Sequence, residues 1–200
     1  RMTDPTPIAR IKVVLDDVAP TVMRRLEIPL TLRLDRLHTV LQVAMGWTDT
    51  HLYEFRIKGI GFGIPDPDWG YGGGPLDARK TTLLDAIADT GAKSFKYLYD
   101  FGDGWEHSIK IERIAPAADG ILYPRLIEAS GRCPPEDVGG PWGYQEAREA
   151  LADPSHERHE EIAEWWGADP LDLDTIDIPA IEAQIVKLAR RWNRKPRTKK

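Results

Sequence analysis

The sequence predicts a protein that combines a β-sheet with α-helices, and two observations indicate this. Alternating apolar and polar residues, typical of strands, fill short runs in the first part of the chain and both sides of a glycine-rich break within residues 95–113. From Tyr144 onward the apolar residues follow helical spacings, with proline and glycine near the expected helix ends. The strands are therefore expected to come mainly first and the helices mainly last.

Strands are predicted on both sides of that break. Residues 8–15 (IARIKVVL) and 22–28 (VMRRLEI) are β-rich runs separated by a turn that contains Pro20. Residues 51–58 (HLYEFRIK) alternate well enough to form a third strand. A further strand is expected at residues 123–129 (YPRLIEA).

One helix is predicted among the early strands. Apolar residues recur at spacings of three and four from Leu34 to Met45, Thr31 can cap the start, and Gly46 stands where a helix ends. A shorter helix is expected over residues 82–90, which Gly91 follows. Three more helices are predicted in the last part of the chain, at residues 144–152, at residues 155–166 with Ser155 as cap and Gly167 as stop, and at residues 179–191 with Pro179 first.

Residues 95–113, FKYLYDFGDGWEHSIKIER, are predicted to form a β-hairpin. A two-residue turn at Asp103 and Gly104 would mix polar and apolar side chains on both faces. A three-residue loop that starts at Gly102 instead pairs Phe101 with Trp105 and separates the faces. Because a slip of one residue would swap the two faces, burial favours this register. The face expected to be buried contains Phe95, Tyr97, Tyr99, Phe101, Trp105, His107, Ile109 and Ile111.

The same register places two acidic residues opposite each other at the turn. Asp100 would face Glu106, with Asp103 at the tip between them. Like charges directly opposite are unfavourable in a sheet. Either water and counter-ions screen these carboxylates on an open surface, or the carboxylates meet a cation, a metal ion or a basic partner.

Two loops are rich in glycine and proline. Residues 59–75, GIGFGIPDPDWGYGGGP, are expected to form an ordered, exposed loop, and their glycines match neither a phosphate-binding loop nor a dinucleotide fingerprint, so no cofactor is expected. Residues 130–144, SGRCPPEDVGGPWGY, contain Pro134 next to Pro135 and should form a stiff loop. Such a loop can hold the carboxylates of Glu136 and Asp137 in fixed geometry, or these acids simply bond to local backbone amides.

The composition excludes several classes of protein. A chain of 200 residues forms one large domain or two small ones. Cys133 is its only cysteine, so the chain offers neither an intramolecular disulfide nor a cysteine-rich zinc site, which fits a reducing cytoplasm. It contains no apolar run long enough to span a bilayer. We therefore expect a soluble, cytoplasmic protein that does not contact the membrane.

The charge is distributed unevenly along the chain. The formal net charge is −5, yet residues 187–200 contain eight cations and no acid, so removing those eight leaves −13 for the remainder. An acidic body is a poor surface for a phosphate backbone, so nucleic acid could be contacted only through this C-terminal tail. The candidate residues are Arg190, Arg191, Arg194, Lys195, Arg197, Lys199 and Lys200. The alternative is that the tail is a solvated end.

Three blocks of sequence resemble a known family. They are LHTVLQVAMGWTDTHLYEF (residues 37–55), YLYDFGDGWEHSI (97–109) and CPPEDVGGPWGY (133–144), and they resemble the Ri-plasmid open-reading-frame-three-like proteins, which are associated with plasmids and insertion elements. The resemblance implies a single α+β domain with a largely antiparallel sheet, an early helix packed on it and a helical C-terminal part. It implies no established activity. We assign residues 8–192 to this domain, residues 1–7 to a disordered segment and residues 193–200 to a basic disordered tail.

Three functions compete at this stage. The first is a non-catalytic binding or accessory protein whose rigid aromatic and acidic loops recognise a protein or peptide. The second is a metal-assisted hydrolase or nuclease in which Asp100, Asp103, Glu136 and Asp137 converge, with His107, on a divalent ion. The third is a mobile-element helper that contacts nucleic acid through the tail. The residues expected to form the site are Trp47, His51, Asp100, Asp103, Trp105, His107, Glu136 and Asp137.

Overall fold

The computed structural model describes residues 4–69 and 72–195, and within them eight strands form one sheet. The strand order is β5-β4-β3-β6-β7-β1-β2-β8, and neighbouring strands run antiparallel except for the parallel pair β4 and β5. The strands are β1 (Pro7–Leu15), β2 (Met23–Pro29), β3 (Tyr53–Ile57), β4 (Ile60–Gly63), β5 (Leu76–Asp77), β6 (Ser94–Tyr99), β7 (Trp105–Pro116) and β8 (Arg125–Ser130). The helices are α1 (Leu34–Met45), α2 (Leu83–Thr90), α3 (Gly140–Ala152), α4 (His159–Trp166) and α5 (Ile178–Trp192). The predicted α+β class is confirmed.

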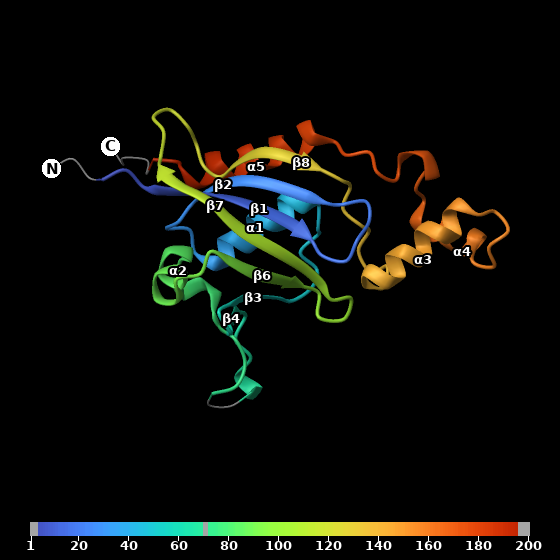
Figure 1. Ribbon diagram of the computed structural model, residues 1–200, viewed down its shortest axis with the longest axis horizontal. Helices are drawn as coiled ribbons and strands as arrows, with labels where there is room; N and C mark the ends of the chain where they lie inside the picture. Colours follow the sequence, from blue (N-terminus) through green and yellow to red (C-terminus); the bar gives the residue numbers. More distant parts are fainter. Residues whose placement is uncertain (1–3, 70–71, 196–200) are drawn as a thin grey trace, which may run out of the picture.

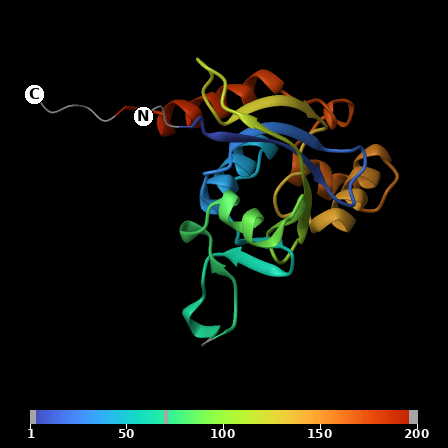
Figure 2. The same ribbon diagram turned by 60° about the vertical axis from the view of Figure 1, so that its left-hand side comes forward.

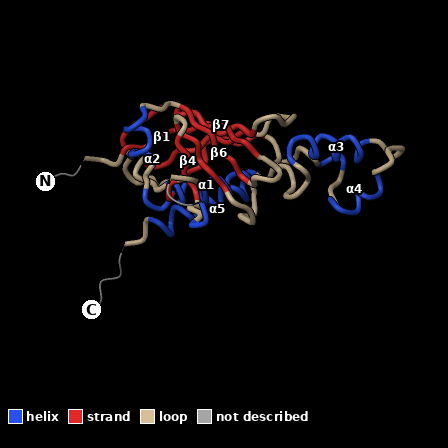
Figure 3. Tube along the Cα trace, turned by 90° about the horizontal axis from the view of Figure 1, so that it is seen from below, coloured by secondary structure: helices blue, strands red, loops and turns tan. Residues whose placement is uncertain are grey.

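The elements lie in two layers with a lobe at one side. Helices α1 and α5 pack against each other on one face of the sheet, and α5 also contacts β8 (Figure 3). Helices α3 and α4 pair with each other and project beyond the end of the sheet (Figure 1). The residues that follow β4 (64–69) and precede β5 (72–75) extend away from the edge of the sheet that β5 forms (Figure 2). None of the described helices is long and apolar enough to cross a membrane.

Helix α1 buries its apolar stripe against the sheet, and Leu34, Leu37 and Leu41 are fully buried. It ends as predicted, with Gly46 in the left-handed conformation at φ 104°. The predicted cap is wrong, because Arg33 is the N-cap residue and no side chain bonds the first turn. A backbone oxygen replaces the missing cap in part. The Leu34 N–H, in the first turn of α1, donates to the backbone oxygen of Thr81, which lies just before α2 (2.9 Å).

The end of α1 is tied to the sheet by a buried arginine. Arg24 on β2 is 1% exposed and donates to the carbonyl oxygens of Ala44 (2.7 Å) and Ser130 (2.9 Å), among others. These acceptors include carbonyls in the last turn of the helix, which carries the negative end of the helix dipole. Backbone oxygens therefore satisfy this buried charge, and they join α1, β2 and the end of β8 close to the site described below.

The central hairpin keeps the predicted faces but not the predicted register. Tyr99 pairs with Trp105 and Tyr97 with His107, a shift of two residues. The loop is longer than expected because Asp100 adopts φ 60° and its backbone oxygen accepts from Gly104 N (2.7 Å). Phe101 consequently leaves the buried face and is 51% exposed. The expected opposition of Asp100 and Glu106 is also wrong, because Glu106 pairs with Leu98.

Other boundaries differ from the predictions at the loops. The expected loop at residues 59–75 contains β4, where a Cβ on Gly63 would lie 2.7 Å from the Tyr53 oxygen, so glycine permits this strand pairing. Helix α3 begins before Tyr144, and α4 begins only at His159. Ser155 does not cap α4, because its hydroxyl bonds Asp153 instead (2.7 Å).

The N-terminal strand begins slightly earlier than expected. β1 starts at Pro7, and the backbone oxygen of Thr6 accepts from Ala117 N (2.9 Å). The segment that we expected to be disordered is therefore hydrogen-bonded at its end. Residues 1–3 of that segment lie outside the described residues.

Candidate metal centre

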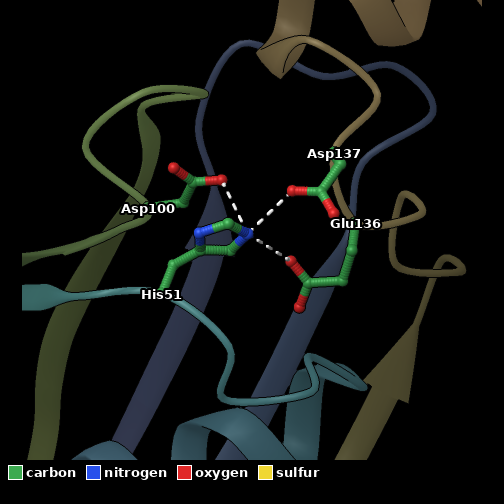
Figure 4. Close-up of side chains that lie close together, drawn as sticks. All are labelled: His51, Asp100, Glu136 and Asp137. Carbon is green, nitrogen blue, oxygen red and sulfur yellow. Dashed lines mark hydrogen bonds and ion pairs between the residues drawn. The ribbon is translucent and has the colours of Figure 1, made fainter.

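Four side chains from three distant segments meet at one end of the sheet (Figure 4). His51 precedes β3, Asp100 follows β6, and Glu136 and Asp137 belong to the proline-rich loop. One ligating atom of each lies within 4.8 Å of the others. The His51 Nε2 atom is 2.7 Å from Asp137 Oδ1, 3.4 Å from Asp100 Oδ2 and 3.9 Å from Glu136 Oε2. We call these four residues the carboxylate–histidine cluster.

Asp100 is held by the hairpin turn that it starts. Its Oδ1 atom accepts from the backbone N–H groups of Gly102 (3.0 Å) and Asp103 (3.2 Å), and its own N–H donates to the Leu52 oxygen (2.9 Å). The residue is 6% exposed and has φ 60°, a conformation uncommon for a residue with a side chain. One carboxylate oxygen is thus fixed by the backbone, and the other points at His51.

Glu136 is held in a similar way from the other side. Its Oε1 atom accepts from the N–H of Thr48 (2.8 Å), the hydroxyl of Thr48 (3.1 Å) and the hydroxyl of Tyr99 (2.9 Å). Its Oε2 atom is buried and has no hydrogen-bond partner among the described residues. A buried carboxylate oxygen without a partner is costly, and that cost is relieved when a cation or a donor occupies the space before it.

His51 and Asp137 complete the cluster at its exposed side. The His51 side chain is 31% exposed and the Asp137 side chain 67%. Burial would lower the pKa of His51, but the hydrogen bond to Asp137 and the charges of Asp100, Asp137 and Glu136 outweigh it, so the pKa lies above its usual value. Protons and metal ions would therefore compete for the same imidazole nitrogen.

Asp103 lies outside the cluster and connects the two loops that form it. Its Oδ2 atom accepts from the Gly139 N–H (3.1 Å). A Cβ on Gly140 would lie 2.2 Å from the Asp103 backbone oxygen, and Gly140 has φ 71°, so only glycine fits this approach. The contact fixes the proline-rich loop against the hairpin tip, and Asp103 positions Glu136 and Asp137 rather than joining them.

Three other residues predicted for the site form a buried aromatic layer. Trp105 and His107 are fully buried, and Trp47 is 6% exposed. Trp47 Nε1 donates to His107 Nε2 (3.1 Å), and His107 Nδ1 donates to the Tyr97 backbone oxygen (3.0 Å). An indole N–H and a backbone carbonyl therefore satisfy both ring nitrogens of His107. His107 does not join the cluster, whose histidine is His51.

A second polar network fixes the loop that carries His51. His38 Nε2 donates to Asp49 Oδ1 (2.7 Å), and His38 Nδ1 accepts from the Tyr97 hydroxyl (2.6 Å), roles assigned because a carboxylate only accepts. Gln42 closes the ring, donating to the Tyr97 oxygen (2.9 Å) and accepting from Asp49 N (2.8 Å). Sequence reasoning missed the roles of these residues, together with those of Thr48 and Tyr99 as supports of Glu136. All of them lie in two of the blocks that carry the family resemblance, but the blocks do not show which side chains bond one another.

The C-terminal tail is described only in part. Arg190 and Arg191 lie in the exposed last turn of α5, and Arg194 and Lys195 follow it. The remaining predicted contacts to nucleic acid, Arg197, Lys199 and Lys200, lie outside the described residues.

Comparison with known proteins identifies the family. Residues 7–180 match the family model described as plasmid pRiA4b ORF-3-like protein. The chain belongs to this family. It is 60% identical over 192 residues to the uncharacterized protein y4hQ of Sinorhizobium fredii, covering 96% of this chain and 97% of the relative. A crystal structure of a protein of unknown function, MM3350 from Methanosarcina mazei Go1, superposes with a TM-score of 0.76 and 28% identity over 90% of this chain and 98% of that one. The predicted family is confirmed, and neither relative's description states an activity.

Proposed function

We propose that this pRiA4b ORF-3-like protein binds a divalent metal ion at the carboxylate–histidine cluster and uses it to activate water for hydrolysis. The buried, unpartnered Oε2 atom of Glu136 carries the proposal. Three carboxylates and one imidazole supply three negative charges to a space only a few ångströms across. A divalent cation relieves their repulsion and satisfies the free oxygen in one step.

The way in which two carboxylates are fixed supports a metal centre over a chance gathering of acids. Asp100 and Glu136 each commit one oxygen to donors of the protein and leave the second for the centre. Supporting bonds of this kind orient metal ligands and lower the entropy that binding costs. The raised pKa of His51 reflects the same concentration of negative charge.

The ligand set indicates which metals fit. Three oxygens and one imidazole nitrogen suit Mn²⁺, Fe²⁺ or Mg²⁺, which prefer six ligands, so about two positions remain for water and substrate. Zn²⁺ in a tetrahedral arrangement would use all four protein ligands and leave no open position. Hydrolysis is therefore expected with a six-coordinate metal, and a purely structural role with zinc.

Metal binding is tested by thermal melts of metal-free protein with magnesium, manganese, calcium or zinc. We expect at least one cation to stabilise the wild type by about 2.7 kcal/mol at a concentration of about 100 Kd. Glu136→Gln should lose most of that stabilisation, while Glu164→Gln, which changes an exposed acid on α4, should keep it. If none of the cations changed the melting temperature of the wild type, both the proposed metal centre and the proposed hydrolase activity would be wrong.

Hydrolysis is tested separately with chromogenic phosphate and carboxylate esters in the presence of the stabilising metal. Turnover should require the metal and should fall at least about tenfold in Asp137→Asn, because this exposed ligand lies on the open side of the cluster. Metal-dependent stabilisation without turnover of any ester would retain the metal centre and discard the enzymatic role.

A non-catalytic recognition role is the second candidate, and one observation favours it. Large apolar side chains near the cluster are exposed: Leu52 (53%) directly follows His51, Phe101 (51%) follows Asp100, and Trp142 (81%) lies in the first turn of α3, after Glu136 and Asp137. Exposed apolar residues next to a rigid polar centre are typical of protein-binding surfaces. A peptide ligand whose affinity falls in Phe101→Ala but not in Glu136→Gln would favour recognition over hydrolysis.

A further inference from the structure

The face of the sheet opposite α1 and α5 carries no helix within the described residues (Figure 3). A groove of about 600 Å³ crosses this face over β3, β6, β7 and β1. No carboxylate lines it, although the whole chain has a net charge of −5. We call it the lysine groove, and its cationic lining consists of Lys12, Arg56, Lys93, Lys96 and Lys110.

The strand register places these cations directly opposite one another. Lys12 on β1 faces Lys110 on β7 and, across its other edge, Arg25 on β2. Arg56 on β3 faces Lys96 on β6. Like charges directly opposite on one face of a sheet are destabilising. Arg25, Lys96 and Arg56 have acidic partners that offset this repulsion, but Lys12 and Lys110 have none within ion-pair distance among the described residues. The Lys12–Lys110 pair therefore lowers the stability of the unliganded sheet, and an anion in the groove would remove that penalty.

Three of the lysines lack an acidic partner. No carboxylate of the described residues lies within ion-pair distance of Lys12, Lys93 or Lys110, whereas neighbouring Arg25 bonds Glu112 at 2.7 Å. Elsewhere in the sheet, Arg10, Arg113 and Arg125 all lie within ion-pair distance of one carboxylate, that of Glu27. Three lysines without an ion-pair partner in the described part of the chain thus line one groove.

Acidic residues limit the groove on both sides. Asp16 pairs with Lys96 (2.6 Å), and Glu106 lies 3.6 Å from Arg56, while Glu112 stands beyond Lys110. From β3 to β1 the groove spans three strand spacings, roughly 14 Å. A long polyanion crossing it would meet these carboxylates, so the charge pattern fits a compact anion.

We propose that the lysine groove binds a compact ligand that carries two or more phosphate groups. Lysine ammonium groups bind phosphate as point charges and do not need the planar fit that arginine requires. Several cations within one groove match a multiply charged ligand better than a single carboxylate. The proposal is independent of the metal centre, which lies at the end of β6 away from Ser94 and Lys93.

Isothermal titration with inorganic pyrophosphate and tripolyphosphate tests the proposal, in the presence of a chelator so that divalent metals play no part. We expect saturable binding that falls at least about tenfold in Lys12→Gln/Lys110→Gln. Lys80→Gln, which changes an exposed lysine on the 3₁₀ turn next to α1, and Glu136→Gln should both bind like the wild type. Lys93→Gln provides a second variant at an exposed position, should the double variant fold poorly.

Thermal melts at low ionic strength add an independent readout. Without ligand, the double variant should melt at or above the wild-type temperature, because it no longer contains the opposed charges of Lys12 and Lys110. Pyrophosphate should raise only the wild-type melting temperature. The proposal is overturned if pyrophosphate does not bind or does not saturate. It is also overturned if Lys80→Gln lowers the affinity for pyrophosphate as much as the double variant does. Binding of a single-stranded oligonucleotide or of polyglutamate in place of the phosphate probes would also overturn it and assign the groove to another class of partner.

Discussion

Two histidines, His51 and His107, have opposite surroundings. His107 is fully buried, and both ring nitrogens are occupied, one by an indole N–H and one by a backbone carbonyl. His51 lies at the strand ends, with three carboxylates directed at a single nitrogen and one carboxylate oxygen left without a partner. Burial lowers the pKa of His107 to about 4, whereas the surrounding acids raise the pKa of His51.

The difference separates structural polar groups from groups available to a ligand. In the aromatic layer, the imidazole of His107 accepts from Trp47, donates to the Tyr97 carbonyl and stays neutral, so it contributes to a single folded arrangement. In the carboxylate–histidine cluster, supporting bonds fix the side chains while leaving negative charge and one buried oxygen uncompensated. The four predictions below test this contrast, and the first two concern the aromatic layer.

The largest effect is expected from Trp105→Ala. Trp105 is fully buried, and its ring lies 5.2 Å from that of Trp47, so truncation leaves a large cavity beneath the cluster. We expect a loss of about 3–5 kcal/mol in the free energy of unfolding, measured by urea titration. Phe101→Ala is the control in the same hairpin and should cost less than about 1 kcal/mol, because Phe101 is half exposed. Equal costs would contradict the hairpin register.

The pH dependence of stability should report His107. Its pKa is about 4 when folded and about 6.5 when unfolded, so below pH 6.5 the unfolded chain binds a proton that the folded protein does not. The neutral imidazole of His107 therefore contributes about 3 kcal/mol to the free energy of unfolding. This contribution is fully present above about pH 6.5 and is lost as the pH falls to about 4.

The measurement is a series of urea titrations between those pH values. His107→Gln should unfold with a flatter pH dependence, although it is less stable overall. The raised pKa of His51 acts in the opposite direction, adding stability below its unfolded value that is lost as pH rises through its folded value. A slope that His107→Gln leaves unchanged would mean that the imidazole is not held neutral.

The fold was largely predictable because local signals were clear. The helical stretch from Leu34 to Met45, its glycine stop and the proline in the first turn of α5 all follow from neighbouring residues. The hairpin register was not predictable from burial, because a shift of two residues preserves both faces. Local hydrogen bonds of Asp100 decide it, and these depend on a positive φ that alternation does not encode.

All four residues of the cluster were among the candidates, but the metal hypothesis combined the acidic residues with His107 instead of His51. Glycine and proline marked the two loops that carry Asp100, Glu136 and Asp137, since rigid loops hold side chains in place. Their meeting with His51 depends on contacts between residues far apart in sequence, such as the Tyr99 hydroxyl with Glu136. A single sequence contains no signal for such a contact. Because contacts of this kind decide which histidine meets the acidic residues, the sequence could not choose between His51 and His107.

The third prediction concerns proton competition at the cluster. Because a metal binds neutral imidazole and the pKa of His51 is raised, apparent metal affinity should fall by up to about tenfold per pH unit once pH drops below that pKa. Isothermal titration of the stabilising metal between about pH 5 and 8 measures it. His51→Gln should bind more weakly at high pH and show a shallower dependence. Wild-type affinity that is independent of pH would exclude His51 as a ligand.

The smallest expected effect separates a positioning residue from a ligand. Asp103 bonds the Gly139 N–H from outside the cluster, so Asp103→Ala should lose about 1 kcal/mol of stability and loosen the loop that carries Glu136. Metal affinity should then fall only severalfold, because all four cluster residues remain. Asp103→Asn retains an acceptor oxygen in the same place and should bind metal nearly as tightly as the wild type. If Asp103→Asn instead abolished metal binding as completely as Glu136→Gln, the Asp103 carboxylate would itself be a metal ligand. Asp103 would then belong to the carboxylate–histidine cluster and would not be a positioning residue.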